Sequence, residues 1–287
     1  MQDRRPLALM TPALLWLTAF MVVPCLLILA LAFFRRGIYG GIDYTFTLEN
    51  LRLVLDPLYA RIFLKSAWIA GLSATIAVVI GYAAAFAIAS RPRAAQPLWL
   101  FFAVLPFWSN YLVRTYAWIV LLNREGLIAT LAHALGYDGE LPKLLYTEGA
   151  VVVGLVYNYL PFVILACYAP LSRLNPEVAE ASLDLGGSRL TTFRRVILPM
   201  TVPGIATGFT FVFVLSIGNF VTPALLGGGQ FQMIGSLVYN QFLKANDWPF
   251  GAAISMVLIA IMMVLLTAQT FASERASGGT PDAGRAS

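Results

Sequence analysis

Charged residues are scarce in this sequence. Only 11% of its 287 residues are Asp, Glu, Lys or Arg, and 59% are hydrophobic. About a quarter of the residues of a water-soluble domain carry charge. The composition therefore excludes an ordinary soluble domain and predicts a protein that lives in lipid.

The residues and motifs of catalytic and metal sites are also few. The single histidine, His133, lies in an amphipathic stretch, and the two cysteines, Cys25 and Cys167, lie in apolar runs, where a small buried hydrophobe is expected rather than a disulfide or a metal ligand. No H-E-x-x-H motif, nucleophile elbow or phosphate-binding G-x-x-x-x-G-K-[ST] occurs, and the glycine run 227–229 lacks the lysine that such a loop needs. We expect no enzyme activity, no ATP hydrolysis, and no metal or cofactor in this chain.

Long apolar runs are abundant. A helix needs about 20 apolar residues to cross a bilayer, and six runs qualify, at about 7–34, 66–89, 98–122, 149–171, 202–226 and 250–271. The first exceeds the apolar core of a cleaved signal peptide and is expected to be retained. The sequence predicts an all-α integral membrane protein with six transmembrane helices in one domain over residues 1–287. An even number of spans places both termini on the same side.

One polar loop, at 172–200, interrupts the apolar runs. Asn175 is a good N-cap, Pro176 suits the first helical position, and Gly186-Gly187 supplies a stop, so a short helix is expected. Ser188 can cap a second helix, which we expect to end at the Leu198-Pro199 boundary. Two short helices at an angle would make a projecting knob.

The first short helix has two different faces. Three acids share one face and three apolar residues share the other, one of which can pack while the other meets a partner. The acids are Glu177, Glu180 and Asp184, and the apolar residues are Val178, Ala181 and Leu185. By periodicity alone, an ordinary amphipathic loop resting at the membrane interface remains open.

The identity of the loop residues distinguishes these alternatives. Glu180-Ala181-Ser182, three residues, Gly186, nine residues and Val196-Ile197-Leu198-Pro199 closely resemble the EAA loop of permease subunits in bacterial ABC importers. Ser182 and Val196 depart from that pattern, which usually has alanine and isoleucine there. Both changes conserve volume and leave the glutamate, glycine and proline in register.

The resemblance implies the type I ABC importer permease fold, with a cytoplasmic coupling helix that inserts into an ATPase subunit. Glu180 would be the ion-pairing contact and Gly186 the turn. The implied coupling residues are Glu177, Glu180, Ala181, Ser182, Asp184, Gly186, Leu198 and Pro199. Lys and Arg are divided almost evenly between the two sides, so the loop decides the orientation: it and both termini lie in the cytoplasm, and the chain lies in the bacterial inner membrane.

The same resemblance implies partners. They are an ATPase dimer that holds ATP and magnesium, a second permease that is a related but distinct chain, a periplasmic solute-binding protein and membrane lipid. No nucleic acid is expected.

A wider resemblance bears on the solute. Residues 112–126, 184–205 and 218–255 are similar to permeases of the polyamine (spermidine/putrescine) branch of these importers. This implies transport of a polyamine or related small amino compound by alternating access. An opine, 4-aminobutyrate or another amino compound remains an alternative.

Candidate path residues are aromatic and amide side chains, because no acid lies in the middle of any span and weak contacts suit transit. Arg114 is the one clear intramembrane ion; it either snorkels to the outer interface beside an aromatic belt or faces the path. Tyr157, Asn158 and Tyr159 precede an expected break at Pro161. The predicted path residues are Asn110, Tyr111, Arg114, Tyr157, Asn158, Asn219 and Phe220.

A secondary transporter and a structural scaffold are alternatives to an importer permease. A secondary transporter would be expected to show inverted repeats and buried acids that bind Na⁺ or H⁺, and neither is evident here. A purely structural scaffold would leave the spacing within 177–199 a coincidence.

Overall fold

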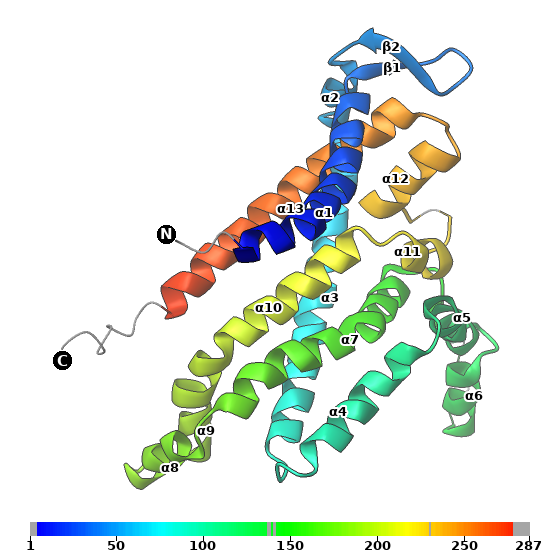
Figure 1. Cartoon of the computed structure of the whole chain (residues 1–287). Coiled ribbons are helices and arrows are strands. Elements are labelled where there is room, and N and C mark those ends of the chain that lie inside the picture. Colours follow the sequence, from blue (N-terminus) through cyan, green and yellow to red (C-terminus); the bar gives the residue numbers. More distant parts are fainter. Residues whose placement is uncertain (1–4, 137–138, 140–141, 230, 278–287) are drawn as a thin grey trace. The chain divides into compact units, whose positions relative to one another are not determined.

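The computed structural model describes residues 5–136, 139, 142–229 and 231–277 (Figure 1). The chain gathers into two compact units: one holds the segment up to residue 61 together with 237–263, and the other holds 62–236 and the segment from 264 onward. No boundary in the sequence indicated this division, and organisation as one domain stays a prediction.

The described residues are mostly helical. The first half holds α1 (Arg5–Leu31), β1 (Phe34–Arg36), β2 (Ile42–Phe46), α2 (Glu49–Val54), α3 (Pro57–Ala89), α4 (Gln96–Val104), the 3₁₀ turn η1 (Leu105–Trp108), α5 (Tyr111–Leu122) and α6 (Leu127–Ala134). The second half holds α7 (Glu148–Arg173), α8 (Pro176–Asp184), α9 (Arg189–Thr192), the π turn η2 (Phe193–Ile197), α10 (Leu198–Ile217), α11 (Val221–Leu226), α12 (Ile234–Leu243) and α13 (Trp248–Ser277). The predicted helical membrane class is confirmed.

Five of these helical stretches are long and apolar enough to cross a membrane: Met10–Leu31, Pro57–Ala89, Glu148–Arg173, Arg189–Ile217 and Trp248–Phe271. They correspond to the first, second, fourth, fifth and sixth predicted spans. The third prediction, one continuous helix over 98–122, is wrong. The segment is instead α4 and η1, an apolar stretch over Gln96–Trp108, followed by α5.

The break in the third span has a local cause. Ser109 and Asn110 are extended, with ψ of 154° and 134°, and the Asn110 side chain accepts the Leu112 N–H at 2.8 Å. Asn110 thus caps a new helix rather than continuing the old one, since a capping asparagine offers the backbone an alternative to the helical bond.

Two expected prolines do not break their helices. α7 runs unbroken through Pro161, and the helix after Ser188 does not end at Pro199 but passes through η2 into α10, where Pro199 lies in the first turn. A proline in the first turn needs no N–H partner. Inside a membrane helix, packed neighbours and local π adjustments accommodate the lost bond.

The core of the larger unit lies where α7 and α10 run side by side (Figure 1). Glycines permit this close approach. A Cβ at Gly204 of α10 would lie 2.6 Å from Pro170 Cγ and 2.7 Å from the Ala166 carbonyl oxygen of α7. Small residues at such an interface let helix backbones approach closely in lipid, where packing rather than hydrophobic burial drives association.

Gly204→Ala is therefore expected to destabilise the protein, because an added methyl group meets a backbone carbonyl that cannot rotate away. Overpacking of this kind costs about 1–3 kcal/mol. Gly71→Ala is the matched control, since its added Cβ has no neighbour nearer than 4.0 Å. Thermal unfolding of the detergent-solubilised protein should distinguish them, and equal melting temperatures would contradict the packing argument.

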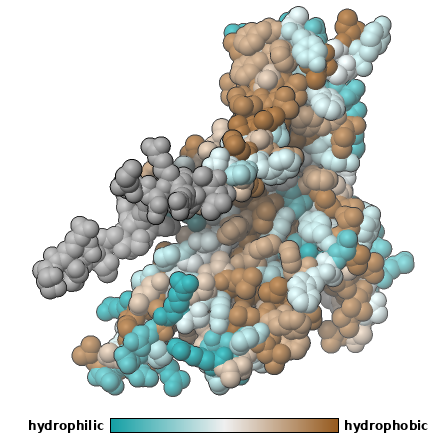
Figure 2. All heavy atoms as spheres, viewed as in Figure 1, coloured by the Kyte–Doolittle hydropathy of each residue, from teal (hydrophilic) through white to brown (hydrophobic). Residues whose placement is uncertain are grey.

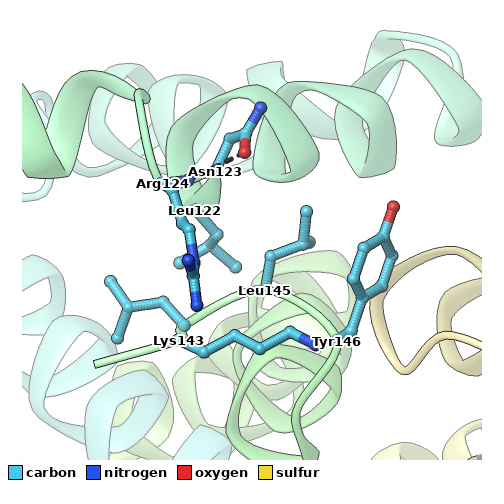
Figure 3. Close-up of a pocket in the computed structure, with 7 residues that line it drawn as sticks. Leu122, Asn123, Arg124, Lys143, Leu145 and Tyr146 are labelled. Carbon is cyan, nitrogen blue, oxygen red and sulfur yellow. Dashed lines mark hydrogen bonds between the residues drawn. The ribbon is translucent and has the colours of Figure 1, made fainter. Parts of the chain in front are cut away.

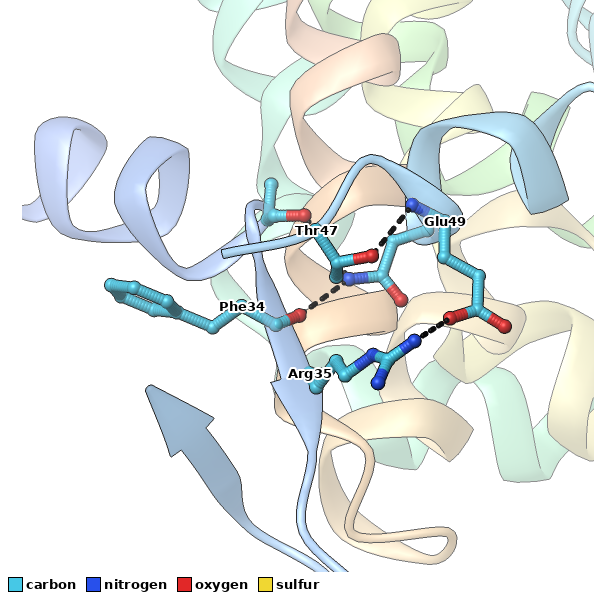
Figure 4. Close-up of polar contacts among 6 residues, drawn as sticks. Phe34, Arg35, Thr47 and Glu49 are labelled. Carbon is cyan, nitrogen blue, oxygen red and sulfur yellow. Dashed lines mark hydrogen bonds and ion pairs between the residues drawn. The ribbon is translucent and has the colours of Figure 1, made fainter. Parts of the chain in front are cut away.

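The smaller unit contains a feature that the helical prediction missed, an antiparallel hairpin of β1 and β2 (Figure 4). Thr47 N donates to the Phe33 carbonyl at 2.8 Å and Glu49 N to Thr47 Oγ1 at 3.2 Å, while Arg35 and Glu49 form an exposed ion pair at 3.3 Å. The turn uses positive φ at Gly40 and Gly41, 89° and 80°. Strands this short pair only where such glycines reverse the chain.

Candidate functional site

The loop at 172–200 forms the two short helices that the sequence predicts. Asn175 caps α8 by accepting the Glu177 N–H at 3.2 Å, and Ser188 caps α9 by accepting the Thr191 N–H at 3.2 Å. Between them Gly186 has φ of +85°. A left-handed residue there turns the chain from one helix axis to the next, which is glycine's usual role after a helix.

The whole of α8 is solvent-accessible, and hydrophilic atoms gather over α8 and α9 at the lower left of Figure 2. Glu180 and Asp184 are exposed, and within the described part of the chain neither forms an ion pair. The apolar face of α8 does not pack against the described residues of this chain, since Val178 is 41% and Leu185 89% exposed. Acidic and apolar faces are thus both free to meet another molecule.

Ser182, one of the two departures from the family pattern, holds the two short helices together. Its Oγ lies 2.9 Å from Thr192 Oγ1, and its carbonyl accepts the Gly187 N–H at 3.0 Å. A Cβ at Gly187 would lie 2.6 Å from that carbonyl oxygen. The glycine pair therefore has two separate roles, with Gly186 supplying the left-handed turn and Gly187 the close approach.

Contacts that the sequence did not predict join this knob to the spans. The Phe193 ring of η2 meets the rings of Phe86 and Tyr82 edge-on, with centroids 5.6 and 6.1 Å apart, and Tyr82 Oη lies 2.9 Å from Thr201 Oγ1 of α10. Leu198 and Pro199 lie in the first turn of α10. A displacement of α8 and α9 would therefore reach α3 and α10 together.

A second polar cluster lies where α10 ends and α11 begins. Asn219 Oδ1 accepts the Thr222 N–H at 2.9 Å, which fixes the amide orientation because a backbone N–H can only donate. Asn219 Nδ2 then donates to Tyr111 Oη and to Tyr159 Oη, both at 2.6 Å. The Tyr111 and Thr222 hydroxyls share a hydrogen bond, with Oη 2.5 Å from Oγ1, and Tyr159 donates to the Leu215 carbonyl at 3.3 Å.

This cluster brings α5, α7, α10 and α11 together. Tyr111, Tyr159 and Asn219 remain partly exposed, whereas Thr222 is fully buried. Tyr111 and Asn219 are among the predicted path residues. Thr222 was not predicted, although an Asn-Phe-Val-Thr stretch at a helix start could have suggested its role. The network supplies hydroxyl and amide groups without a formal charge, which can bind a cation or a polar solute weakly.

Tyr111→Phe is expected to cost more stability than Tyr159→Phe. The first change removes contacts of 2.6 and 2.5 Å, and the second removes contacts of 2.6 and 3.3 Å. Each good hydrogen bond contributes about 0.5–1.5 kcal/mol net. Thermal unfolding of both single variants and the double variant tests this order, with the double variant expected to lose more than the sum because Asn219 Nδ2 then has no acceptor. Equal losses in the two single variants would contradict the assigned geometry.

The other predicted path residues lie in different surroundings. Asn110 caps α5, the Tyr157 ring meets the Trp118 ring edge-on at 5.5 Å, and Phe220, at the start of α11, is 41% exposed. Asn158 is 1% exposed, and neither Oδ1 nor Nδ2 has a hydrogen-bond partner among the described residues. The structure therefore does not bring these four into the Asn219 cluster.

Arg114 does not snorkel. Its side chain is 7% exposed, with its guanidinium carbon 5.2 Å from the Phe107 ring centroid and 5.9 Å from that of Tyr111. Nε and Nη1 have no hydrogen-bond partner among the described residues. The break before α5 explains this burial, because a helix beginning at Tyr111 carries Arg114 into its first turn, against η1.

A cavity of about 250 Å³ lies between the end of α5 and the segment before α7 (Figure 3). Arg124 and Asn123 line it from one side, and Lys143, Leu145 and Tyr146 from the other. Tyr146 has φ of +60°, a strained conformation for a bulky residue, and it also lines a neighbouring cavity of about 730 Å³ bordered by the glycine run 227–229. Strain of this kind is held where the surrounding structure fixes it.

This chain resembles known transport proteins in its sequence. The profile of the family described as binding-protein-dependent transport system inner membrane component matches residues 7–277. The chain belongs to this family. It is 37% identical over 251 residues, 88% of this chain and 91% of the relative, to the spermidine/putrescine transport system permease protein PotB of Escherichia coli K12. It is 38% identical to PotB of Haemophilus influenzae, over 88% of each chain.

Solved structures agree on the fold. A bacterial alginate ABC transporter, solved with an alginate pentasaccharide-bound periplasmic protein, superposes with a TM-score of 0.73 at 15% identity, over 96% of this chain and 95% of the other. A second alginate importer structure gives 0.71 at 17% identity, over 98% and 97%. The type I permease fold implied by the sequence is thus supported along almost the whole chain. Of its six predicted spans, five are long helical stretches in the described residues. As a family member the chain is a non-catalytic, multi-pass inner membrane transport subunit.

Proposed function

We propose that this permease passes a polyamine, or a closely related small amino compound, from a periplasmic binding protein to the cytoplasm. The observation that carries the proposal is the identity of 37–38% with spermidine/putrescine permeases over 88% of the chain. The uncharged tyrosine and asparagine cluster agrees with it, because such groups attract an ammonium ion without holding it tightly.

The coupling loop supports an ATP-driven mechanism. α8 presents Glu180 and Asp184 without partners in the described chain and leaves Val178 and Leu185 exposed, as a helix needs for docking in a groove of another subunit. We assign that groove to an ATPase dimer, which would bind the ATP and magnesium. The loop and both termini then lie in the cytoplasm.

The path is assigned to the Asn219 cluster with Phe220 beside it. One six-span chain cannot enclose a path, so a second permease, a related but distinct chain, is expected to complete it. Movement of α8 and α9 would be transmitted through Phe193 and Thr201 to α3 and α10, opening the path alternately to each side.

Within the larger unit, the end opposite the coupling loop is assigned to the binding protein. The segment with Lys143 and Tyr146 and the glycine run 227–229 border the two cavities there. The alginate importer that shares this fold was solved in complex with a periplasmic protein, which supports an equivalent docking here.

Calorimetry on the partner binding protein tests the solute. The titrants are spermidine, putrescine, 4-aminobutyrate and an opine, and each compound that binds is then tested for stimulation of ATP hydrolysis by the reconstituted complex. A polyamine that both binds and stimulates supports the proposal. Binding and stimulation by 4-aminobutyrate or an opine alone would overturn the polyamine assignment and leave the importer mechanism in place.

A further inference from the structure

Lys65 and Glu148 form an ion pair at the N-terminal end of α7, in the larger unit. Lys65 Nζ of α3 is 2.5 Å from Glu148 Oε1, the first residue of α7, and the two side chains are 45% and 53% exposed. Past Glu148, α7 has no other acid, and neither α3 nor α10 has any. Glu148 is thus the one carboxylate on these three spans, and solvent can reach it.

Lys65 has a second attractive contact. Its ammonium lies 4.7 Å from the centroid of the Phe231 ring, a distance at which a cation is attracted to the ring face. The Phe231 side chain is 8% exposed, and three residues later the Ile234 N–H donates to Ser66 Oγ at 2.8 Å. The segment that carries Phe231 is therefore anchored to α3, and the ring stays beside Lys65 whether or not Lys65 touches Glu148.

These two contacts make the ion pair easy to exchange. A half-exposed pair contributes little to stability, because solvent screens it and ordering two long side chains costs entropy. An incoming ammonium ion can take the place of Lys65 on Glu148, while the Lys65 ammonium keeps its contact with the Phe231 ring.

We propose that Glu148 receives an ammonium group of the solute as it leaves the binding protein, and that Lys65 is the built-in competitor which the solute displaces. This inference rests on the proposed function, which makes the solute a cation and this end the outer mouth. Lys65 would keep Glu148 neutralised between solutes and prevent the solute from being held too tightly for transit.

The two substitutions are therefore expected to have different effects, a loss for Glu148→Gln and no loss for Lys65→Met. Glu148→Gln removes the receiving carboxylate, so more solute escapes outward after release, and the solute carried per ATP hydrolysed should fall about two- to fivefold. Lys65→Met frees the carboxylate and should leave this ratio unchanged or raise it up to about twofold. Raising the salt concentration should shrink the effect of Glu148→Gln.

A purely structural ion pair predicts something different. Either substitution would then break the same contact, so both single variants and the double variant would lose the same amount. If Glu148 receives the solute, Glu148→Asp, which keeps the charge, should retain most of the solute carried per ATP hydrolysed. Glu49→Gln is the matched control, because Glu49 forms a comparably exposed pair with Arg35 at 3.3 Å and should leave the ratio unchanged.

The measurement uses the full complex in proteoliposomes, with saturating loaded binding protein, following solute uptake and ATP hydrolysis together. Assembly of each variant is checked by size-exclusion chromatography. A loss with Glu148→Gln together with an unchanged or raised ratio with Lys65→Met supports the inference. Equal losses, or no change with Glu148→Gln, overturn it alone, whereas a wild-type complex that carries no polyamine overturns the proposed function and the inference with it.

Discussion

Gly186→Val is expected to reduce solute uptake more than tenfold while the chain still inserts and folds in the membrane. Gly186 has φ of +85°, and no atom lies within 4 Å of an added Cβ, so the substitution meets no clash. It meets only backbone strain, since a β-branched residue in a left-handed conformation costs about 1–3 kcal/mol. The turn between α8 and α9 would relax and α8 would point elsewhere. Uptake and co-purification of the ATPase measure the loss.

The control for this change is Gly186→Asn. Asparagine tolerates the left-handed conformation much better than valine, so it should retain most of the uptake. Equal behaviour of the valine and asparagine variants would contradict the role given to the backbone at this turn.

The helix proposed to dock on the ATPase, α8, carries two acids that can be compared. Glu180 has no partner within the described chain, whereas the Glu177 carboxylate accepts Asn175 Nδ2 at 2.9 Å. Glu180→Ala should therefore weaken ATPase association more than Glu177→Ala. Unchanged uptake with Glu180→Ala would remove this glutamate from the coupling mechanism.

Substitution of Arg114 is expected to separate stability from transport. Arg114 is buried and forms no ion pair with any described residue, and burying such a charge costs free energy. Arg114→Met should therefore raise the melting temperature by a few degrees, about 2–4 °C for each kcal/mol gained in a protein of this size. Uptake should nevertheless fall about tenfold, equivalent to 1.4 kcal/mol in the rate-limiting barrier. The guanidinium lies over Tyr111, whose hydroxyl binds Asn219 and Thr222.

Arg114→Lys provides the discriminating comparison. A lysine keeps the charge but lacks the planar group that stacks on Phe107 and Tyr111, and its compact ammonium is more strongly hydrated than a guanidinium. It should lower both the melting temperature and the uptake. A silent Arg114→Lys would mean that the side chain reaches the membrane surface in the working protein, as the sequence first suggested.

Local chemistry made much of the fold predictable. Apolar runs long enough to cross a bilayer, the caps at Asn175 and Ser188, and the left-handed turn at Gly186 depend on residues within a few positions of one another. The break in the third span also has a local signal, the N-cap residue Asn110. A span predicted from the apolar content of 98–122 does not register a single capping residue. Pro161 and Pro199 predict helix breaks when only the local sequence is considered. In the structure both lie within continuous helical stretches, because neighbouring helices pack around Pro161 and Pro199 lies in the first turn of α10.

The sequence by itself determined that this chain spans a membrane and that its polar loop at 172–200 forms two short helices joined by a left-handed turn, because each rests on composition or on a short motif. Only the tertiary structure decided which polar side chains meet. Tyr111 and Asn219 are 108 residues apart and Lys65 and Glu148 are on different helices. Their contacts, and the burial of Arg114, depend on how whole helices pack, which no local pattern encodes.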